Sequence, residues 1–148
     1  MINNILFPKF YKYKKVHNKK CNLSNKLKII KLIYGTYGFV SKNFGYISSN
    51  QLEAIRNIIN KNIKKISKPL FYITPNLPIL KKSKSSRMGS GAGNILNSWF
   101  YRVNPGSVIA EVYDINYKYI LNIFNSVSCR VPFKICLVKK ERFNYEEY

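Results

Sequence analysis

Apolar residues recur at helical spacing in two stretches of the chain. In the first stretch they stand three or four residues apart, at Leu52, Ile55, Ile59, Ile63 and Ile66. Ser48 and Gln51 have the spacing of a capping box, so a helix is predicted from Ser48 to about residue 67. The second stretch predicts a helix that is capped by Asp114 and runs to about Val127.

Short runs of β-branched and aromatic residues, separated by Gly and Pro, predict strands. They cover residues 29–34, 70–74, 99–103, 107–113 and 133–138. A turn at Asn104-Pro105-Gly106 makes the third and fourth runs hairpin partners, and Pro75 and Pro78 interrupt the chain after the second. The order of elements predicts an α+β fold, a two-layer sandwich of a mainly antiparallel sheet with two helices.

The chain divides into three predicted parts. Its 148 residues are the length of one domain, which we place at residues 29–140. A basic N-terminal arm precedes the domain at residues 1–28, and a charged tail follows at residues 141–148. Residues 81–93 are almost without large apolar side chains, so they predict a long, exposed and mobile Gly-rich loop.

Charge narrows the class of protein. The chain has 26 Lys and Arg against 6 Asp and Glu, a formal net charge of +20. Such a charge favours a polyanionic partner, and 46% hydrophobic residues exclude a disordered basic tail. No run of apolar residues reaches the roughly 18 that a membrane-spanning helix needs. A nucleic acid is the first polyanion to consider and an anionic membrane surface is the other; we predict a nucleic-acid partner and no membrane.

Few residues are suited to enzyme or metal chemistry. The chain has one histidine, and Cys21, Cys129 and Cys136 are not at metal-ligand spacing, so we interpret them as buried or half-buried thiols. The six carboxylates offer few pairs for acid–base chemistry. We predict no catalytic residue, no metal site and no cofactor.

Cations in three places are the predicted RNA contacts. Lysines attract phosphates, and the aromatic residues interleaved in the arm can stack on unpaired bases. The predicted contacts are Lys9, Lys12, Lys14, Lys15, His17, Lys19 and Lys20 in the arm, Arg56 and Lys64 on the first helix, and Lys81, Lys82 and Lys84 in the loop. A solvated tail or a targeting peptide is the alternative for the arm, and a solvated basic face is the alternative for the helix.

Alternating glycines in the loop raise the question of nucleotide binding. Gly89, Gly91 and Gly93 do not fit a dinucleotide fingerprint, because the third glycine comes one residue early and no apolar strand precedes them. A Walker loop needs Gly-Lys-Ser/Thr, which is absent. The loop instead offers backbone N–H groups and cations to a phosphate-rich surface.

An ordered set of motifs runs through the chain. It starts with Pro8-Lys9 and Lys14-Lys15-Val16-His17, followed by Tyr34-Gly35-Thr36-Tyr37-Gly38-Phe39 and Gln51-Leu52-Glu53-Ala54-Ile55-Arg56. It ends with Arg87-Met88-Gly89-x-Gly91-x-Gly93, Trp99 and Pro105-Gly106-x-Val108-x-x-Glu111. Over about residues 8–140 the chain resembles the family of the universal large-subunit ribosomal protein sixteen.

The resemblance implies a structural role in the ribosome. It implies binding to large-subunit ribosomal RNA, with neighbouring large-subunit proteins as further partners and no homo-oligomer. It also implies a loop that faces the peptidyl-transferase centre and aminoacyl-site tRNA, formed by Arg87, Met88, Gly89, Gly91 and Gly93. The chain departs from the family at Ser90 and Ala92, where lysines are usual, and at residues 18–22.

A codon bias bears on where the protein works. Residue types with A/T-rich codons predominate, and 21 Lys stand against 5 Arg, as expected from an AT-rich genome. About seven residues precede the family-like start, too few for a cleavable presequence. We expect an organelle-encoded protein of the mitochondrial ribosome, in the matrix, with a plastid or a reduced bacterium as alternatives.

Two other function classes remain open. A free basic RNA- or DNA-binding protein of the nucleoid type would carry the same charge but would not sediment with ribosomes. A phosphate-loop enzyme is the third class, and a nucleotide-binding assay would separate it from the other two.

Overall fold

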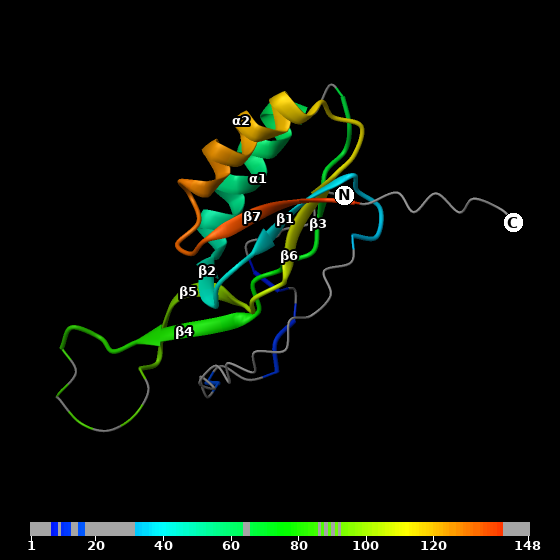
Figure 1. Cartoon of the computed structure of the whole chain (residues 1–148). Coiled ribbons are helices and arrows are strands. Elements are labelled where there is room, and N and C mark those ends of the chain that lie inside the picture. The colour runs from blue at the N-terminus through cyan, green and yellow to red at the C-terminus, as the bar shows by residue number, and fades with distance from the viewer. Residues whose placement is uncertain are drawn as a thin grey trace, which may run out of the picture.

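The structure is a computed structural model that describes residues 7–8, 10–12, 15–16, 32–63, 66–85, 87, 89, 91 and 93–140. Its elements are β1 (Tyr37–Ser41), β2 (Gly45–Ser48), α1 (Ser49–Ile63), β3 (Leu70–Phe71), β4 (Leu77–Lys81), β5 (Ile95–Val103), β6 (Val108–Val112), α2 (Tyr117–Ser128) and β7 (Ile135–Lys139). The predicted α+β class is confirmed (Figure 1). The predicted tail and most of the arm lie outside these residues.

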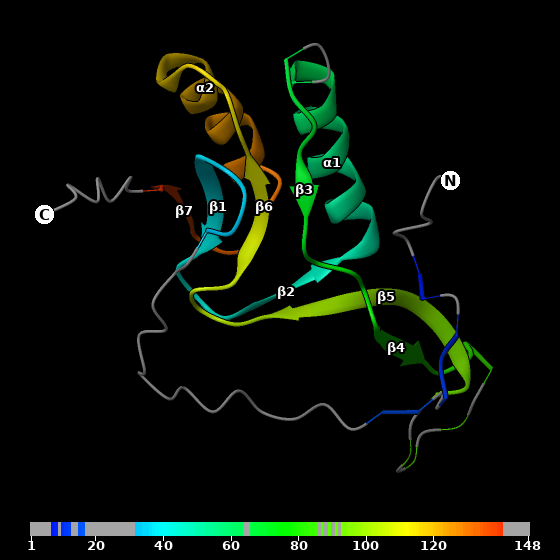
Figure 2. The ribbon, with the colours of Figure 1, turned by 90° about the vertical axis from the view of Figure 1, so that its right-hand side faces the viewer.

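The strands of the described chain form two antiparallel sheets rather than one. The larger sheet has the strand order β3-β6-β1-β7, and the smaller sheet has the order β2-β5-β4. Both helices lie on one side of the larger sheet (Figures 1 and 2). The smaller sheet continues into a β4–β5 ribbon that projects away from the helices (Figure 1).

Helix α1 begins as its sequence predicts. The Ser48 N–H donates to Gln51 Oε1 at 3.0 Å, and the Gln51 N–H donates to Ser48 Oγ at 3.2 Å. This is the reciprocal capping box, which satisfies two of the free backbone donors at a helix start. The helix ends at Ile63, a turn earlier than predicted, and Ile66 beyond it is 54% exposed.

Helix α2 begins later than predicted and has a different cap. The expected cap, Asp114, has a φ of 53°, in the left-handed region, and does not adjoin the helix. Asn116 has the extended conformation of an N-cap, and its side chain accepts from the Lys118 N–H at 3.2 Å. Neither described helix is long and apolar enough to cross a bilayer.

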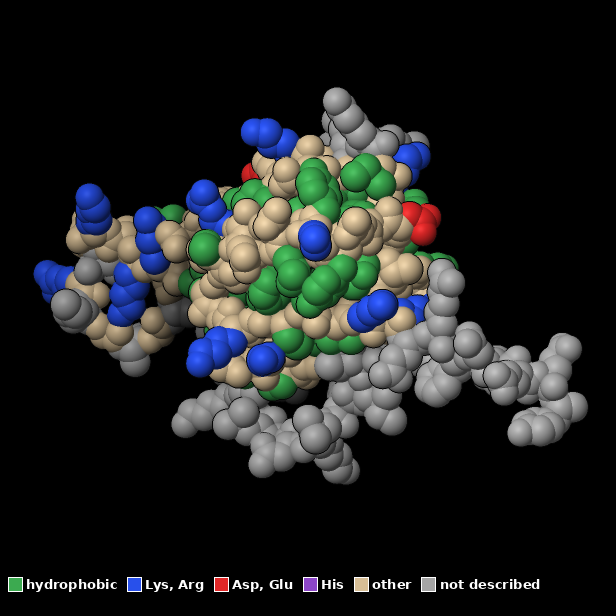
Figure 3. All heavy atoms as spheres, turned by 45° about the horizontal axis from the view of Figure 1, so that its top comes forward, with side chains coloured by type: hydrophobic (Ala, Val, Ile, Leu, Met, Phe, Trp, Pro, Cys, Tyr) green, Lys and Arg blue, Asp and Glu red, His purple; other side chains and the backbone are tan. Residues whose placement is uncertain are grey.

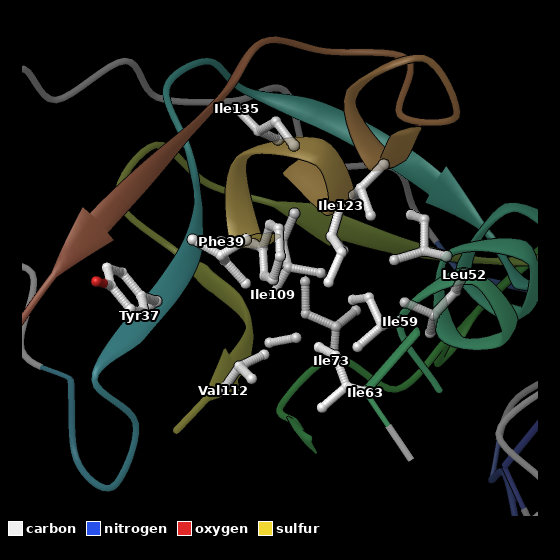
Figure 4. Close-up of a cluster of buried hydrophobic side chains, with 14 of the residues drawn as sticks. Tyr37, Phe39, Leu52, Ile59, Ile63, Ile73, Ile109, Val112, Ile123 and Ile135 are labelled. Atoms are coloured by element: carbon white, nitrogen blue, oxygen red, sulfur yellow. The ribbon is translucent and has the colours of Figure 1, made fainter. Parts of the chain in front are cut away.

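The core lies between the helices and the larger sheet. Figure 4 shows Phe39 and Ile109 of the sheet beside Ile123 of α2, with Ile59 of α1 close to them. Each of these four side chains is at most 2% exposed. Burial of an apolar face on each helix is the main source of stability for such a layered fold.

One predicted strand is misplaced. Residues 32–34 were expected to end a strand, but they are irregular, and β1 begins only at Tyr37. The reason is that the N–H groups of Ile33 and Tyr34 donate to the carboxylate of Glu111 and not to a neighbouring strand. Residues 29–31 of that prediction lie outside the described chain.

The predicted hairpin between residues 99–103 and 107–113 is wrong. Its turn exists, since the Ser107 N–H donates to the Asn104 carbonyl at 3.1 Å and Gly106 has a φ of 79°. However, β5 pairs with β2 and β4, whereas β6 pairs with β1 and β3. The turn therefore carries the chain from one sheet to the other.

Pro78 does not interrupt the chain as expected. It lies inside β4 opposite Trp99, and β4 is an outer strand of the smaller sheet. A proline is tolerated there because one side of an outer strand needs no ladder hydrogen bond.

Candidate nucleic-acid interface

The β4–β5 ribbon carries the predicted Gly-rich loop at its end. The two strands pair from Leu77 opposite Phe100 to Lys81 opposite Ile95. A side chain at Gly93 would overlap the backbone of Lys81 and Lys82, so only glycine lets the two ends of the loop come this close. The Lys82 ammonium donates to the carbonyl of Gly89 across the loop.

The cations of the loop are exposed. Lys81, Lys82, Lys84 and Arg87 all lie on the surface, within seven residues of sequence. Among the described residues the acidic side chains are on α1, on β6 and before α2, and none is on the ribbon or loop. Figure 3 shows blue side chains gathered on this projection. We call Lys81–Arg87 of the loop the cationic tip.

The described part of the N-terminal arm lies against the same ribbon. The ring of Tyr11 packs edge-on against Trp99 of β5, with 5.0 Å between ring centroids and 70° between planes. Trp99 is only 7% exposed, and Tyr11 is one of the residues in contact with it. Lys12 and Lys15 of this part of the arm are exposed, and Figure 2 shows the described arm segments near the start of β5. The structure thus brings two separately predicted RNA-binding segments together.

Arg56 lies elsewhere. It is half-buried on α1, and its guanidinium stands 5.7 Å from the centroid of the Phe71 ring in β3, a cation–π contact. This places it with the helix and the larger sheet and not with the cationic tip. Its assignment as an RNA contact stays a prediction.

Several predicted site residues lie outside the described chain. They are Lys9, Lys14, His17, Lys19, Lys20, Lys64 and Met88. Gly91 is described, and its φ of 128° is one that glycine adopts without strain.

The thiols and other candidate metal ligands of the described residues do not form a cluster. Cys136 is half-buried, as predicted, whereas Cys129 is exposed, because it follows the last turn of α2 at the surface. Cys21 lies outside the described residues. Within the described chain, no three His, Cys, Asp or Glu side chains come together.

The sequence patterns missed the role of Glu111. Its side chain is 1% exposed, and it accepts the N–H groups of Ile33 at 3.0 Å, Tyr34 at 2.9 Å and Gly35 at 2.7 Å. Burial raises the pKa of this carboxyl, but the three backbone donors and the Tyr72 hydroxyl together lower it below its ordinary value. The only signal in the sequence was its place in the motif after Gly106.

The fold and the interface together define the class of protein. It is a small α+β protein whose β4–β5 ribbon projects, carries exposed cations at its end and lies beside a basic N-terminal arm. Within that class, the family model described as "Ribosomal protein L16p/L10e" matches residues 8–138. The chain belongs to this family. It is a structural protein of the ribosome and not an enzyme, which confirms the resemblance and the predicted lack of enzymatic activity.

Three relatives, all bacterial, carry the name "Large ribosomal subunit protein uL16". The chain is 30% identical to that of Buchnera aphidicola over 139 residues, which cover 92% of the chain and 98% of the relative. It is 31% identical to that of Coprothermobacter proteolyticus over 136 residues, with 92% and 99% covered. It is 36% identical to that of Xylella fastidiosa over 109 residues, with 73% and 77% covered.

Proposed function

We propose that this protein is a constituent of the large ribosomal subunit that binds large-subunit ribosomal RNA through its cationic tip and N-terminal arm. The names of its relatives support the assignment to this subunit. Neighbouring large-subunit proteins are its further partners, and one copy acts without self-association.

The observation that carries the proposal is the meeting of arm and hairpin. Four exposed cations occupy the tip, the described acids lie elsewhere, and the Tyr11–Trp99 contact holds basic residues of the arm beside the same ribbon. Phosphate contacts from such a surface release counterions, so they supply affinity without needing a particular base sequence.

The tip also supports a role beside the peptidyl-transferase centre and aminoacyl-site tRNA. Arg87 is exposed there, between Lys84 and Gly89. Its guanidinium can contact a phosphate through two parallel hydrogen bonds or stack on a base. The adjacent glycines leave backbone N–H groups open to a close-lying phosphate. We assign this role to residues Arg87, Met88, Gly89, Gly91 and Gly93 together.

The ribosome we propose is organellar, a mitochondrial one first and a plastid one second. The support is compositional: 21 Lys against 5 Arg, in a chain rich in residues with A/T-rich codons. Detection of the endogenous chain in purified mitochondrial ribosomes would agree with this. Detection only in plastid ribosomes would replace the first location with the second.

Sucrose-gradient sedimentation of the endogenous protein tests the main proposal. A large-subunit protein should follow the large subunit through the gradient after subunits are separated at low Mg²⁺. It should shift to the top of the gradient after ribonuclease treatment. A free nucleoid-type protein would stay near the top in both cases, and that result would contradict the proposal.

A further inference from the structure

A single buried carboxylate ties the root of the N-terminal arm to the domain. Glu111 Oε1 accepts the Ile33 N–H, and Oε2 accepts the N–H groups of Tyr34 and Gly35. The donors are 76 to 78 residues away in sequence. A Cβ at residue 35 would lie 2.8 Å from Cβ of Glu111 and 2.9 Å from the Val112 nitrogen, so the close approach requires glycine.

The residues on either side of these donors are held as well. Leu32 is 5% exposed and packs over Gly38, where a side chain would overlap it. The Lys140 ammonium donates to the Ile33 carbonyl at 2.8 Å, and the Lys140 N–H donates to the Thr36 carbonyl at 2.8 Å. We call residues 32–36 the arm root.

Apart from Leu32, the arm root gains little from burying its own side chains. Ile33 is 59% exposed and Tyr34 is 70% exposed. Its order therefore depends on the hydrogen bonds to Glu111, on Leu32 and on Lys140. Three successive backbone donors converging on one carboxylate are charge-assisted, and they fix the orientation of all three peptide groups at once. The side chain of Glu111 thus sets the place and direction in which the chain leaves β1 towards the arm.

We propose that Glu111 is a positioning residue for RNA binding: by fixing the arm root it holds the N-terminal arm where arm and cationic tip meet one RNA surface together. The inference rests on the proposed function. The Tyr11–Trp99 contact is a further attachment of the arm, at a place far from the arm root in sequence. Two linked binding segments raise the affinity only when their geometry allows both to engage.

Overall charge and the proposed positioning role predict opposite effects of removing the Glu111 carboxylate on RNA affinity, so the two can be told apart. Removing a negative charge from a protein that binds RNA should leave affinity unchanged or raise it. Removing the Glu111 carboxylate should lower it, because the arm loses its fixed root. Glu53 is the matched control, since it is an exposed carboxylate on α1.

The experiment compares Glu111→Gln and Glu53→Gln in the full-length chain. Affinity for a large-subunit ribosomal RNA fragment is measured by fluorescence anisotropy at 10 °C, with folding checked by circular dichroism. We expect Glu53→Gln to bind as tightly as the unchanged chain or more tightly. We expect Glu111→Gln to bind about tenfold more weakly, a part of the roughly 10²- to 10⁴-fold that linking two binding segments can add. Equal affinity of the two variants would overturn the inference.

A second step separates positioning from general loss of structure. Glu111→Gln is repeated in a full-length chain whose arm lysines Lys9, Lys12, Lys14 and Lys15 are changed to Gln, and in one whose Lys81, Lys82 and Lys84 are changed to Gln. The tenfold effect should vanish in both backgrounds, because linkage raises affinity only when the arm and the cationic tip both bind the RNA. A tenfold effect that persists in both backgrounds would show that Glu111 acts through the fold and would overturn the inference.

The test remains decisive if Glu111→Gln fails to fold or if the unchanged chain fails to bind the RNA. If Glu111→Gln does not fold, Tyr72→Phe replaces it in the unchanged chain and in both lysine-to-Gln backgrounds, because this substitution removes only the phenol donor to Glu111. Tyr72→Phe should then lower the RNA affinity by a smaller factor, with the same dependence on the lysine background. A loss of affinity that does not depend on the background would overturn the inference. If the unchanged chain does not bind the RNA, the proposed function itself fails, and this is seen before any variant is made.

Discussion

Neutralising the cationic tip should change how RNA binding depends on salt. The perturbation is a variant with Lys81, Lys82, Lys84 and Arg87 all changed to Gln, which removes four of the 26 basic side chains. All four side chains are exposed, so the free energy of unfolding should change little, by about 0.5 kcal/mol or less for each.

The magnitude follows from counterion release. Each phosphate contact adds roughly 0.9 to the slope of log affinity against log salt on duplex B-form DNA and roughly 0.7 on single strands, and we take this range for a folded RNA. The Lys82 ammonium already donates to the Gly89 carbonyl, so we count three to four contacts from the tip. The slope should fall by about 3. Between 50 and 200 mM salt, the unchanged chain should therefore lose about sixtyfold more affinity than the variant does.

The assay is anisotropy titration of a large-subunit ribosomal RNA fragment at several KCl concentrations. The control variant changes Lys61, Lys118, Lys134 and Lys139 to Gln. These four lysines are also exposed, but Lys61 lies on α1, Lys118 on α2, and the other two directly before β7 and at its last residue. It has the same net charge as the tip variant, and its slope should stay within about 1 of the unchanged chain. Equal slopes for the two variants would mean that overall charge and not the tip binds the RNA, and our reasoning would be refuted.

Three other outcomes are expected. Ser48→Ala removes one half of the capping box with Gln51 and should lower the free energy of unfolding by about 1 kcal/mol in urea titration; Ser126→Ala, on the exposed face of α2, should change it less. The pKa of Glu111 is lowered in the folded chain, so the ionised carboxylate stabilises the fold at any pH above its ordinary pKa of 4.5. This stabilisation is lost as the pH falls through the lower pKa of the folded chain. Between pH 5 and 2 the thermal midpoint of unfolding should therefore fall more for the unchanged chain than for Glu111→Gln. Arg87→Lys should leave the melting temperature and subunit assembly unchanged but slow peptide-bond formation or weaken aminoacyl-site tRNA binding, because lysine cannot form two parallel hydrogen bonds to a phosphate. Full activity of this variant in a translation assay would mean that Arg87 is only a solvent-exposed side chain without a role in translation.

Local signals in the sequence predicted the local structure well. The capping box at Ser48 and Gln51, the turn at Pro105-Gly106 and the apolar stripe of α1 as far as Ile63 were correct, because each depends on residues close together in the chain. Strand pairing was not predictable in this way. A tight turn after β5 suggested a hairpin with β6, yet β5 pairs with the preceding strand β4 and with the distant strand β2, and no local pattern in the sequence indicates these partners.

The interface was predicted in pieces and not as a whole. The cations of the arm and loop could be read from the sequence, but their meeting depends on Tyr11 packing against Trp99, 88 positions further along the chain. Glu111 was visible as a motif residue, whereas its role needs donors from a segment far away in sequence. Such long-range contacts arise from packing, which composition and periodicity do not specify.

Crosslinking of the protein to RNA within intact large subunits tests the central claim most directly. Ultraviolet irradiation of purified subunits, followed by mass spectrometry of the peptides that retain a nucleotide, locates each contact on the chain. We predict crosslinks in the peptides that span Lys81–Gly93 and in those of residues 1–28. Crosslinks confined to α2 and β7, with none from the cationic tip, would contradict the account.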